Sequence, residues 1–242
     1  MNPGNNNGPN GPFTYTNMPT RFVGQADIGT RLDFIRKTYA LFFASVVVAI
    51  FGAGFALASG LAAAVANFMF VALIAWFISS IGARAVARTP VVQYVGLFGF
   101  TFFTGIVFAP LLYMYQTIAP GVVQQAGILT FIVFGSLTAY AFISKKDFNF
   151  LGGILFVALI ALIVGGIANI FIGSSAIAFF SAWVALILFS GFVLYDTSRI
   201  MLRLDEGAYC VAAIELFVDF LNLFLALLRI CLLYTSPSPR DS

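Results

Sequence analysis

Seven long apolar runs alternate with short polar breaks along the chain. A bilayer core of about 30 Å requires about 20 apolar residues in a crossing helix, and each of the seven runs is that long. Backbone groups in lipid must be hydrogen-bonded internally, so the runs are predicted to be helices. The alternation of a β-barrel strand is absent from all of them. The predicted spans are residues 38–59, 61–83, 91–115, 122–144, 148–173, 175–197 and 211–230.

Positive charges occur only in every second connection. Turns predicted at Ser59-Gly60, at Pro110 with 116–121, and at Gly173-Ser174 carry no charge. By the positive-inside rule, the N-terminus is predicted to be cytoplasmic. Seven full crossings place the C-terminus outside, unless the last segment is re-entrant. The ten cationic residues that set this orientation are Arg21, Arg31, Arg36, Lys37, Arg84, Arg88, Lys145, Lys146, Arg199 and Arg203.

Composition strengthens the membrane assignment and removes several functional classes. Hydrophobic residues make up 61% of the 242 residues and charged ones 9%, whereas a soluble domain is roughly a quarter charged. A net charge of +3 without a clustered basic face excludes nucleic acid as a partner. The chain has no His, so common zinc and haem ligand sets and His-based catalytic triads are unavailable. We therefore expect a polytopic all-α protein without a cofactor, with the lipid bilayer around it.

Both ends of the chain differ from the apolar middle. Residues 1–20 are rich in Asn, Gly and Pro, and residues 1–26 are predicted to form a disordered cytoplasmic tail. Residues 27–37 form a short amphipathic stretch that we expect along the membrane surface. Residues 27–230 are predicted to be the seven-helix membrane domain. Residues 231–242, CLLYTSPSPRDS, resemble the in-frame translation of a sequencing adapter and are predicted not to be native.

Acidic residues in the last two predicted spans are the candidates for chemistry. Asp196 lies near the end of the sixth span, about one turn before Arg199. Glu215, Asp219 and Asn222 stand at i, i+4 and i+7, which places them on one helical face. A carboxylate in hydrocarbon is costly, so this stripe must face the bundle interior or water. Glu215 and Asn222 are candidates for an ion path.

A meeting of Asp196 and Asp219 would create a pH switch without histidine. Two adjacent buried carboxylates cannot easily both be charged, so the pair would share one proton and titrate as a unit. An arginine from the second span, Arg84 or Arg88, could latch the ionised form. The simpler interpretation stays open: Asp196 caps its helix or pairs with Arg199 at i+3, and Glu215 reaches the interface.

Five stretches of the chain together carry a resemblance to a known family. They are DIGTRLDFIRKTYALF, TFFTGIVFAPLL, SKKDFNFLGG, FSGFVLYDTSRI and IELFVDFLNLFLALLRI. They resemble the Bax inhibitor-1 family, and especially its bacterial inner-membrane branch, over about 27–230. The resemblance implies two three-helix layers around the seventh helix, and a pH-sensitive calcium leak with Asp196 and Asp219 as the proton-sharing pair. It also implies an arginine latch on the second helix, for which Arg88 is preferred over Arg84.

Three functional hypotheses follow, and they belong to different classes. The first is a cation leak in which Asp219 binds Ca²⁺ transiently, since Ca²⁺ prefers oxygen ligands. The second is a non-transporting regulator of a membrane-bound protease, or of a stress or death response. The third, an intramembrane aspartyl protease, is disfavoured because Phe217 and Val218 precede Asp219 where the protease motif requires Gly-x-Gly. We therefore expect no enzymatic activity.

Overall fold

The computed structural model describes residues 22–87, 89, 92–205 and 207–235, and their regular structure is helical. Seven of the helices are long and apolar enough to cross a membrane; α2 is too short. One isolated β-bridge joins Phe22 to Asp205. The elements are η2 (Val23–Gln25), α1 (Ile28–Ala58), α2 (Leu61–Asn67), α3 (Met69–Val86), α4 (Val92–Ile118), α5 (Val122–Ser144), α6 (Leu151–Ile172), α7 (Ser175–Leu202) and α8 (Tyr209–Thr235).

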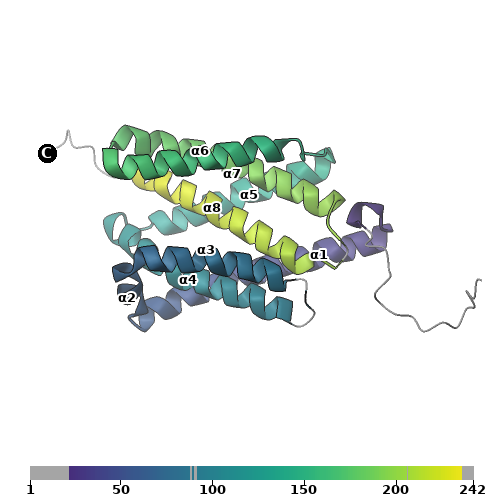
Figure 1. Ribbon diagram of the computed structural model, residues 1–242, viewed down its shortest axis with the longest axis horizontal. Coiled ribbons are helices and arrows are strands. Elements are labelled where there is room, and N and C mark those ends of the chain that lie inside the picture. The colour runs from purple at the N-terminus through teal and green to yellow at the C-terminus, as the bar shows by residue number, and fades with distance from the viewer. Residues whose placement is uncertain (1–21, 88, 90–91, 206, 236–242) are drawn as a thin grey trace, which may run out of the picture.

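The spanning helices form two layers with α8 between them. Figure 1 shows α6 and α7 on one side of α8 and α3 and α4, with the short α2, on the other, while α5 crosses α8 in this view. Helix α8 contacts α5 and α7 in the first layer and α1, α3 and α4 in the second. It is also the span with the largest buried share of residues. An all-α polytopic membrane protein of this arrangement agrees with the prediction.

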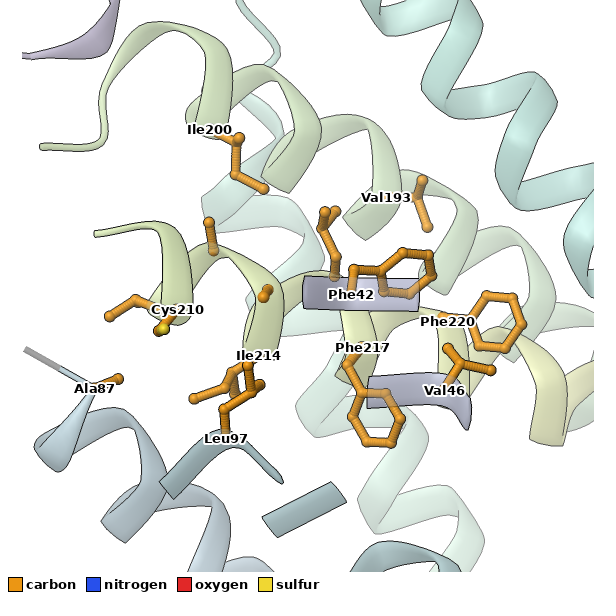
Figure 2. Packing of buried hydrophobic residues seen from close by; sticks show 14 of the residues in the cluster. Phe42, Val46, Ala87, Leu97, Val193, Ile200, Cys210, Ile214, Phe217 and Phe220 are labelled. Atoms are coloured by element: carbon orange, nitrogen blue, oxygen red, sulfur yellow. The ribbon is translucent and has the colours of Figure 1, made fainter. Parts of the chain in front are cut away.

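A cluster of aromatic and aliphatic side chains fills the space around α8. Figure 2 shows side chains of α1, α7 and α8 meeting around Phe42, Phe217 and Phe220. The Phe42 ring stacks on Phe134 with centroids 5.0 Å apart and meets the Phe220 ring edge-on at 5.6 Å. Such contacts, rather than a hydrophobic driving force, hold helices together in lipid. This core fixes the position of the acidic face of α8.

Helices α1 and α4 approach each other most closely, at two glycines. A Cβ atom on Gly105 would collide with the backbone of Ala49 and Ala53, and one on Gly52 would collide with the backbone carbonyl of Phe102. These two positions therefore require glycine, because only a residue without a side chain leaves room for the neighbouring backbone.

One break in the helices was not predicted, and one predicted break is wrong. The run at 61–83 is not one helix, because Phe68 leaves helical geometry at φ −118° and ψ 33° and separates α2 from α3. Asn67, a weak helix former, precedes this break. Conversely, Pro110 does not end its helix: α4 continues through it to Ile118. A proline removes one hydrogen bond, and neighbouring helices tolerate such a loss inside a membrane bundle.

Several helix ends also differ from the prediction. The amphipathic stretch 27–37 is not a separate surface segment, because α1 begins at Ile28 and continues to Ala58. Asp27 caps it by accepting hydrogen bonds from Thr30 N at 3.2 Å and Thr30 Oγ1 at 2.7 Å. Helix α7 extends five residues beyond the predicted end at 197, and α8 extends through five residues of the stretch 231–242.

The predicted tail, residues 1–26, is described only in part. Residues 1–21 lie outside the described residues, as do 236–242 at the other end. The last five residues of the tail are ordered: Val23 is fully buried, and its N–H donates to the Leu204 carbonyl at 2.8 Å. Packing against the bundle is therefore already present before Asp27, because Val23 occupies an apolar position beside the α7–α8 connection.

Candidate functional site

Asp196 and Asp219 lie side by side on neighbouring helices. Asp196 is on α7, two turns before its end, and Asp219 is on α8. The residues are only 8% and 5% exposed, and their carboxyl groups are close enough to interact with each other. Two adjacent carboxyl groups can hydrogen-bond to each other only if one of them carries a proton. The structure thus brings together the two acids that the sequence singled out.

Arg199 supplies the nearest positive charge to this pair. Its Nη1 lies 3.1 Å from Glu215 Oε1 and 3.6 Å from Asp196 Oδ1. The guanidinium therefore bridges α7 and α8, with Asp196 one turn before it on the same helix. Its side chain is 35% exposed, whereas those of Asp196 and Glu215 are almost covered. The ionic centre consists of one cation and three acids from two helices.

Two carboxyl oxygens in this cluster have no hydrogen-bond partner among the described residues. They are Asp219 Oδ2 and Glu215 Oε2, and both atoms are shielded from solvent. An unpaired oxygen on a buried acid costs free energy. Such an atom therefore marks a place where water or an ion can bind to the oxygen. Each acid thus uses one oxygen within the cluster and leaves the other available.

A cavity of about 710 Å³ adjoins the cluster. Its walls come from α3 and α6, and α7 and α8 bring Asp196, Arg199, Glu215, Asp219 and Asn222 to it. Among the described residues, α3 makes no contact with α6 or α7, so nothing closes the space between these helices. Asn222 faces the same cavity as Asp219, as the i, i+3 spacing requires. All four polar candidates of the last two spans therefore meet at one hollow.

Of the two arginines proposed as a latch, one can be placed. Arg88 lies outside the described residues. Arg84, in the last turn of α3, lines the acidic cavity, and its charge acts on Asp196, Glu215 and Asp219. Among the described residues, the ion pairs of these acids come from Arg199 instead. Arg84 faces the acids across the cavity without holding one.

Sequence reasoning missed the central position of Arg199. It placed Arg199 in a connection and considered it only as an i+3 partner of Asp196. Helix α7 continues to Leu202, so Arg199 keeps a helical orientation and turns toward Glu215 on α8. The signal was present in the spacing, because Asp196 and Arg199 lie on one helical face only if the helix does not end at 197.

The C-terminal end of α7 is braced by contacts with the α5–α6 connection. Arg203 Nη2 donates to Asp147 Oδ2 in the α5–α6 connection, and Ser198 Oγ accepts from Phe148 N at 3.0 Å. The hydrogen bond from Arg203 is the main cause that lowers the pKa of Asp147 from its ordinary value of 3.8. These contacts hold the turn that follows Asp196 against the rest of the bundle.

The chemical capacity of the site is that of a proton and charge store. Among the described residues, no group of three or more His, Cys, Asp and Glu side chains is arranged to hold a metal ion. What the site provides is a pair of adjacent acids, a third acid and an arginine, all beside a cavity. Such coupled groups change their charge together when pH changes.

Comparison with known proteins agrees with this architecture. The profile of the family described as "Inhibitor of apoptosis-promoting Bax1" matches residues 31–236. An uncharacterized protein of Campylobacter jejuni is 36% identical over 206 residues, which cover 81% of this chain and 87% of the relative. An uncharacterized membrane protein of Vibrio cholerae is 36% identical over 198 residues, with the same coverage of 81% and 87%.

A more distant likeness reaches beyond bacteria. The Golgi anti-apoptotic protein of vaccinia virus is 37% identical over 134 residues, which cover 55% of each chain. The family profile includes both helices of the acidic site, and the two bacterial relatives extend over most of the chain. The chain therefore belongs to the Bax inhibitor-1 family of membrane proteins.

Proposed function

We propose that this protein is a pH-sensitive calcium leak in which Asp196 and Asp219 share a proton and set whether the path is open. The observation that carries the proposal is that these two buried acids, from neighbouring helices, lie together at a cavity of about 710 Å³. An ionisable acid inside a membrane is energetically unfavourable, and acids at such positions commonly serve in proton relays or ion paths.

The closed state follows from the charges. With one proton on the pair, the four groups carry two negative charges and one positive charge, and Arg199 holds α7 and α8 together through Asp196 and Glu215. Arg84 attracts the remaining negative charge from α3. A second proton on the pair removes the charge of Asp196. The attraction of Arg199 for Asp196 and the attraction of Arg84 for the acid pair then both weaken.

Helix α3 is the element free to respond. It packs on α4 and has few contacts with α8, and among the described residues none with α6 or α7. When the acid pair becomes neutral, the attraction between Arg84 and the far wall of the cavity falls. Helix α3 then moves away from α7, and the cavity widens. A change at one pair of oxygens is thereby converted into a change of helix position.

The ion in this proposal is a hard divalent cation. Ca²⁺ binds carboxylate and amide oxygens, and the acidic cavity offers Asp219, Glu215 and Asn222 on one face of α8. The unpaired oxygens of Asp219 and Glu215 are shielded from solvent, and they become ligands for an entering ion once the cavity widens. Binding is transient, since a leak requires that the ion also leaves.

We place the protein in a bacterial inner membrane with the N-terminus in the cytoplasm. The start of α1 and the α3–α4, α5–α6 and α7–α8 connections gather at one end of the bundle (Figure 1). That end carries Arg84, Lys145, Lys146 and Arg203, so the positive-inside rule supports this orientation. The acid pair then lies in the cytoplasmic half of the membrane, where it senses cytoplasmic pH.

Calcium flux in liposomes that contain only this protein tests the proposal. We expect Asp219→Asn to remove most of the pH dependence between pH 5 and 8, and Asp196→Asn to shift its midpoint or leave the path open. Asp33→Asn is the matched control, because Asp33 is an exposed acid that pairs with Lys37 at 3.4 Å, away from the cavity. If both cavity variants leak as the parent does at every pH, the proposal is wrong.

The alternative function is regulation of a membrane-bound protease, or of a stress or death response, without transport. The family description and the name of the vaccinia relative favour it, because both refer to apoptosis. The liposome experiment separates the two functions: a regulator gives no flux above that of empty liposomes at any pH. Flux in the absence of any partner protein argues for the leak.

A further inference from the structure

A second cavity lies further along the same pair of helices. It has a volume of about 360 Å³ and is lined by α4, α7 and α8. Tyr115, Asn222 and Arg229 are its polar residues. We call it the Arg229 cavity, and the cavity of about 710 Å³ the acidic cavity. Both cavities lie over one face of α8, because Glu215, Asp219, Asn222 and Arg229 are spaced at i, i+4, i+7 and i+14.

The two cavities share two lining residues, Phe189 of α7 and Asn222 of α8. Phe189 lies seven residues before Asp196, which puts it on the same face of α7 and about 10 Å further along the helix. Asn222 lies one turn beyond Asp219. A polar groove therefore follows α8 for about 20 Å from Glu215 to Arg229, and Phe189 and Asn222 stand where its two hollows meet.

The two hollows differ in the charged residues that line them. The acidic cavity holds three acids, Asp196, Glu215 and Asp219, with Arg84 and Arg199 at its rim. Among the residues that line the Arg229 cavity, Arg229 is the one with a charged side chain. Among the described residues, no acid lies within ion-pair distance of Arg229. A bulky apolar ring between two polar hollows is the arrangement that excludes water from a narrow passage.

We propose that Phe189, with Asn222 opposite, is the constriction that separates the acidic cavity from the Arg229 cavity and closes a route through the bundle along α7 and α8. The proposal rests on the proposed function for its meaning as an ion path, but the constriction itself is a statement about access. Phe189 would thus be a barrier residue, distinct from the acids that sense pH.

Cysteine accessibility tests the barrier without any calcium measurement. In a chain whose two native cysteines are replaced by alanine, Ala185→Cys reports on the Arg229 cavity and Ser80→Cys on the acidic cavity. A membrane-impermeant thiol reagent is applied separately to each side, in intact cells and in inverted vesicles. From the side where α8 ends, we expect Ala185→Cys to react and Ser80→Cys to stay unmodified.

Removing the ring should connect the two cavities. We expect Phe189→Ala to make Ser80→Cys react from that side at least ten times faster. Phe192→Ala is the matched control, because Phe192 lines only the acidic cavity, and it should leave the rate unchanged. Phe189→Leu keeps apolar bulk at this position, so Ser80→Cys should react at the parent rate in that variant. The comparison separates loss of the bulky side chain from a loss of folding caused by any change at this position.

Three results would overturn the barrier. The first is that Ala185→Cys does not react from either side. The second is that Phe189→Ala and Phe192→Ala change the reaction rate of Ser80→Cys equally, and the third is that Ser80→Cys already reacts from the α8 end when Phe189 is present. Calcium flux separates the barrier from the proposed function. If Phe189→Ala raises flux several-fold at pH 8, both stand. If the accessibility pattern holds and no variant conducts calcium, the barrier stands and the calcium leak fails.

Discussion

Helices α1 and α4 form a closed seam, whereas α3 and the α6–α7 pair face each other across an open one. In the closed seam, Gly52 and Gly105 let the backbones touch. In the open seam, α3 makes no contact with α6 or α7 among the described residues, and the acidic cavity occupies the space between them. The bundle is thus tightly joined on one side of α8 and parted on the other.

The difference shows how one helix bundle can be both stable and responsive. Lipid provides no hydrophobic force between helices, so close backbone packing at small residues supplies much of the cohesion. A seam that is packed in this way has no space for charged groups. The ionisable residues of α7 and α8 lie in the open seam, where a change of charge can move a helix without breaking the core around Phe42 and Phe220.

The largest expected effect comes from breaking the closed seam. Gly105→Ala should cost about 3 kcal/mol, because its Cβ would collide with backbone atoms that cannot move aside. Gly99→Ala, on the same helix, is the matched control, since no heavy atom lies within 4 Å of the added Cβ. The measurement is the thermal midpoint of unfolding in detergent. Equal midpoints for the two variants would show that the α1–α4 seam is not closely packed.

A smaller loss of stability is expected from the ionic centre of the open seam. Arg199→Gln leaves Glu215 and Asp196 without their cation; removing one partner of a fully buried pair costs about 3–5 kcal/mol. Because Arg199 is 35% exposed, we expect about 2 kcal/mol. Adding Glu215→Gln should restore at least half of the lost midpoint. No recovery in the double variant would mean that Arg199 acts by packing rather than by charge.

The smallest loss of stability is expected from a solvent-exposed ion pair. This loss gives a reference for the two larger ones. Asp147→Asn removes the ion pair with Arg203, whose side chains are 44% and 51% exposed, and should cost less than about 1 kcal/mol. The pKa of Asp147 is lowered in the folded protein, so its contribution is present above its ordinary pKa of 3.8 and is lost as pH falls through the folded value. The midpoints of variant and parent should therefore differ at pH 7 and converge below the folded pKa. A difference that persists in acid would exclude the ion pair as its cause.

Sequence patterning predicted the spans well where apolar runs and helix signals coincide. Helix α5 has the predicted bounds, because Gly121 at φ 89° and Lys145 at φ 51° end it on both sides. The break at Phe68 was not predictable, since the residues around it are as apolar as those of a continuous span. Pro110 gave a false signal, because a proline consistent with a turn is also tolerated inside a membrane helix.

Sequence spacing predicted which acidic residues share a helix face, but it did not predict which arginine they meet. The i, i+4, i+7 spacing identified Glu215, Asp219 and Asn222 as one stripe, and the structure places all three at one cavity. Which arginine meets the acids depends on how α7 and α8 cross, and no periodicity contains that information. The contact between Arg199 and the acids is therefore known only from the structure. The position of Arg84 near the acids was predictable, because Arg84 lies at the end of α3 that faces the same side as Asp196.

Infrared spectroscopy of the aspartate carboxyl groups tests most directly whether Asp196 and Asp219 hold one proton together. With ¹³C-labelled aspartate, the parent should show one protonated carboxyl band that disappears in a single step as pH rises, and either Asp196→Asn or Asp219→Asn should abolish or shift it. Two independent titrations, or a band that survives unchanged in both variants, would contradict the account.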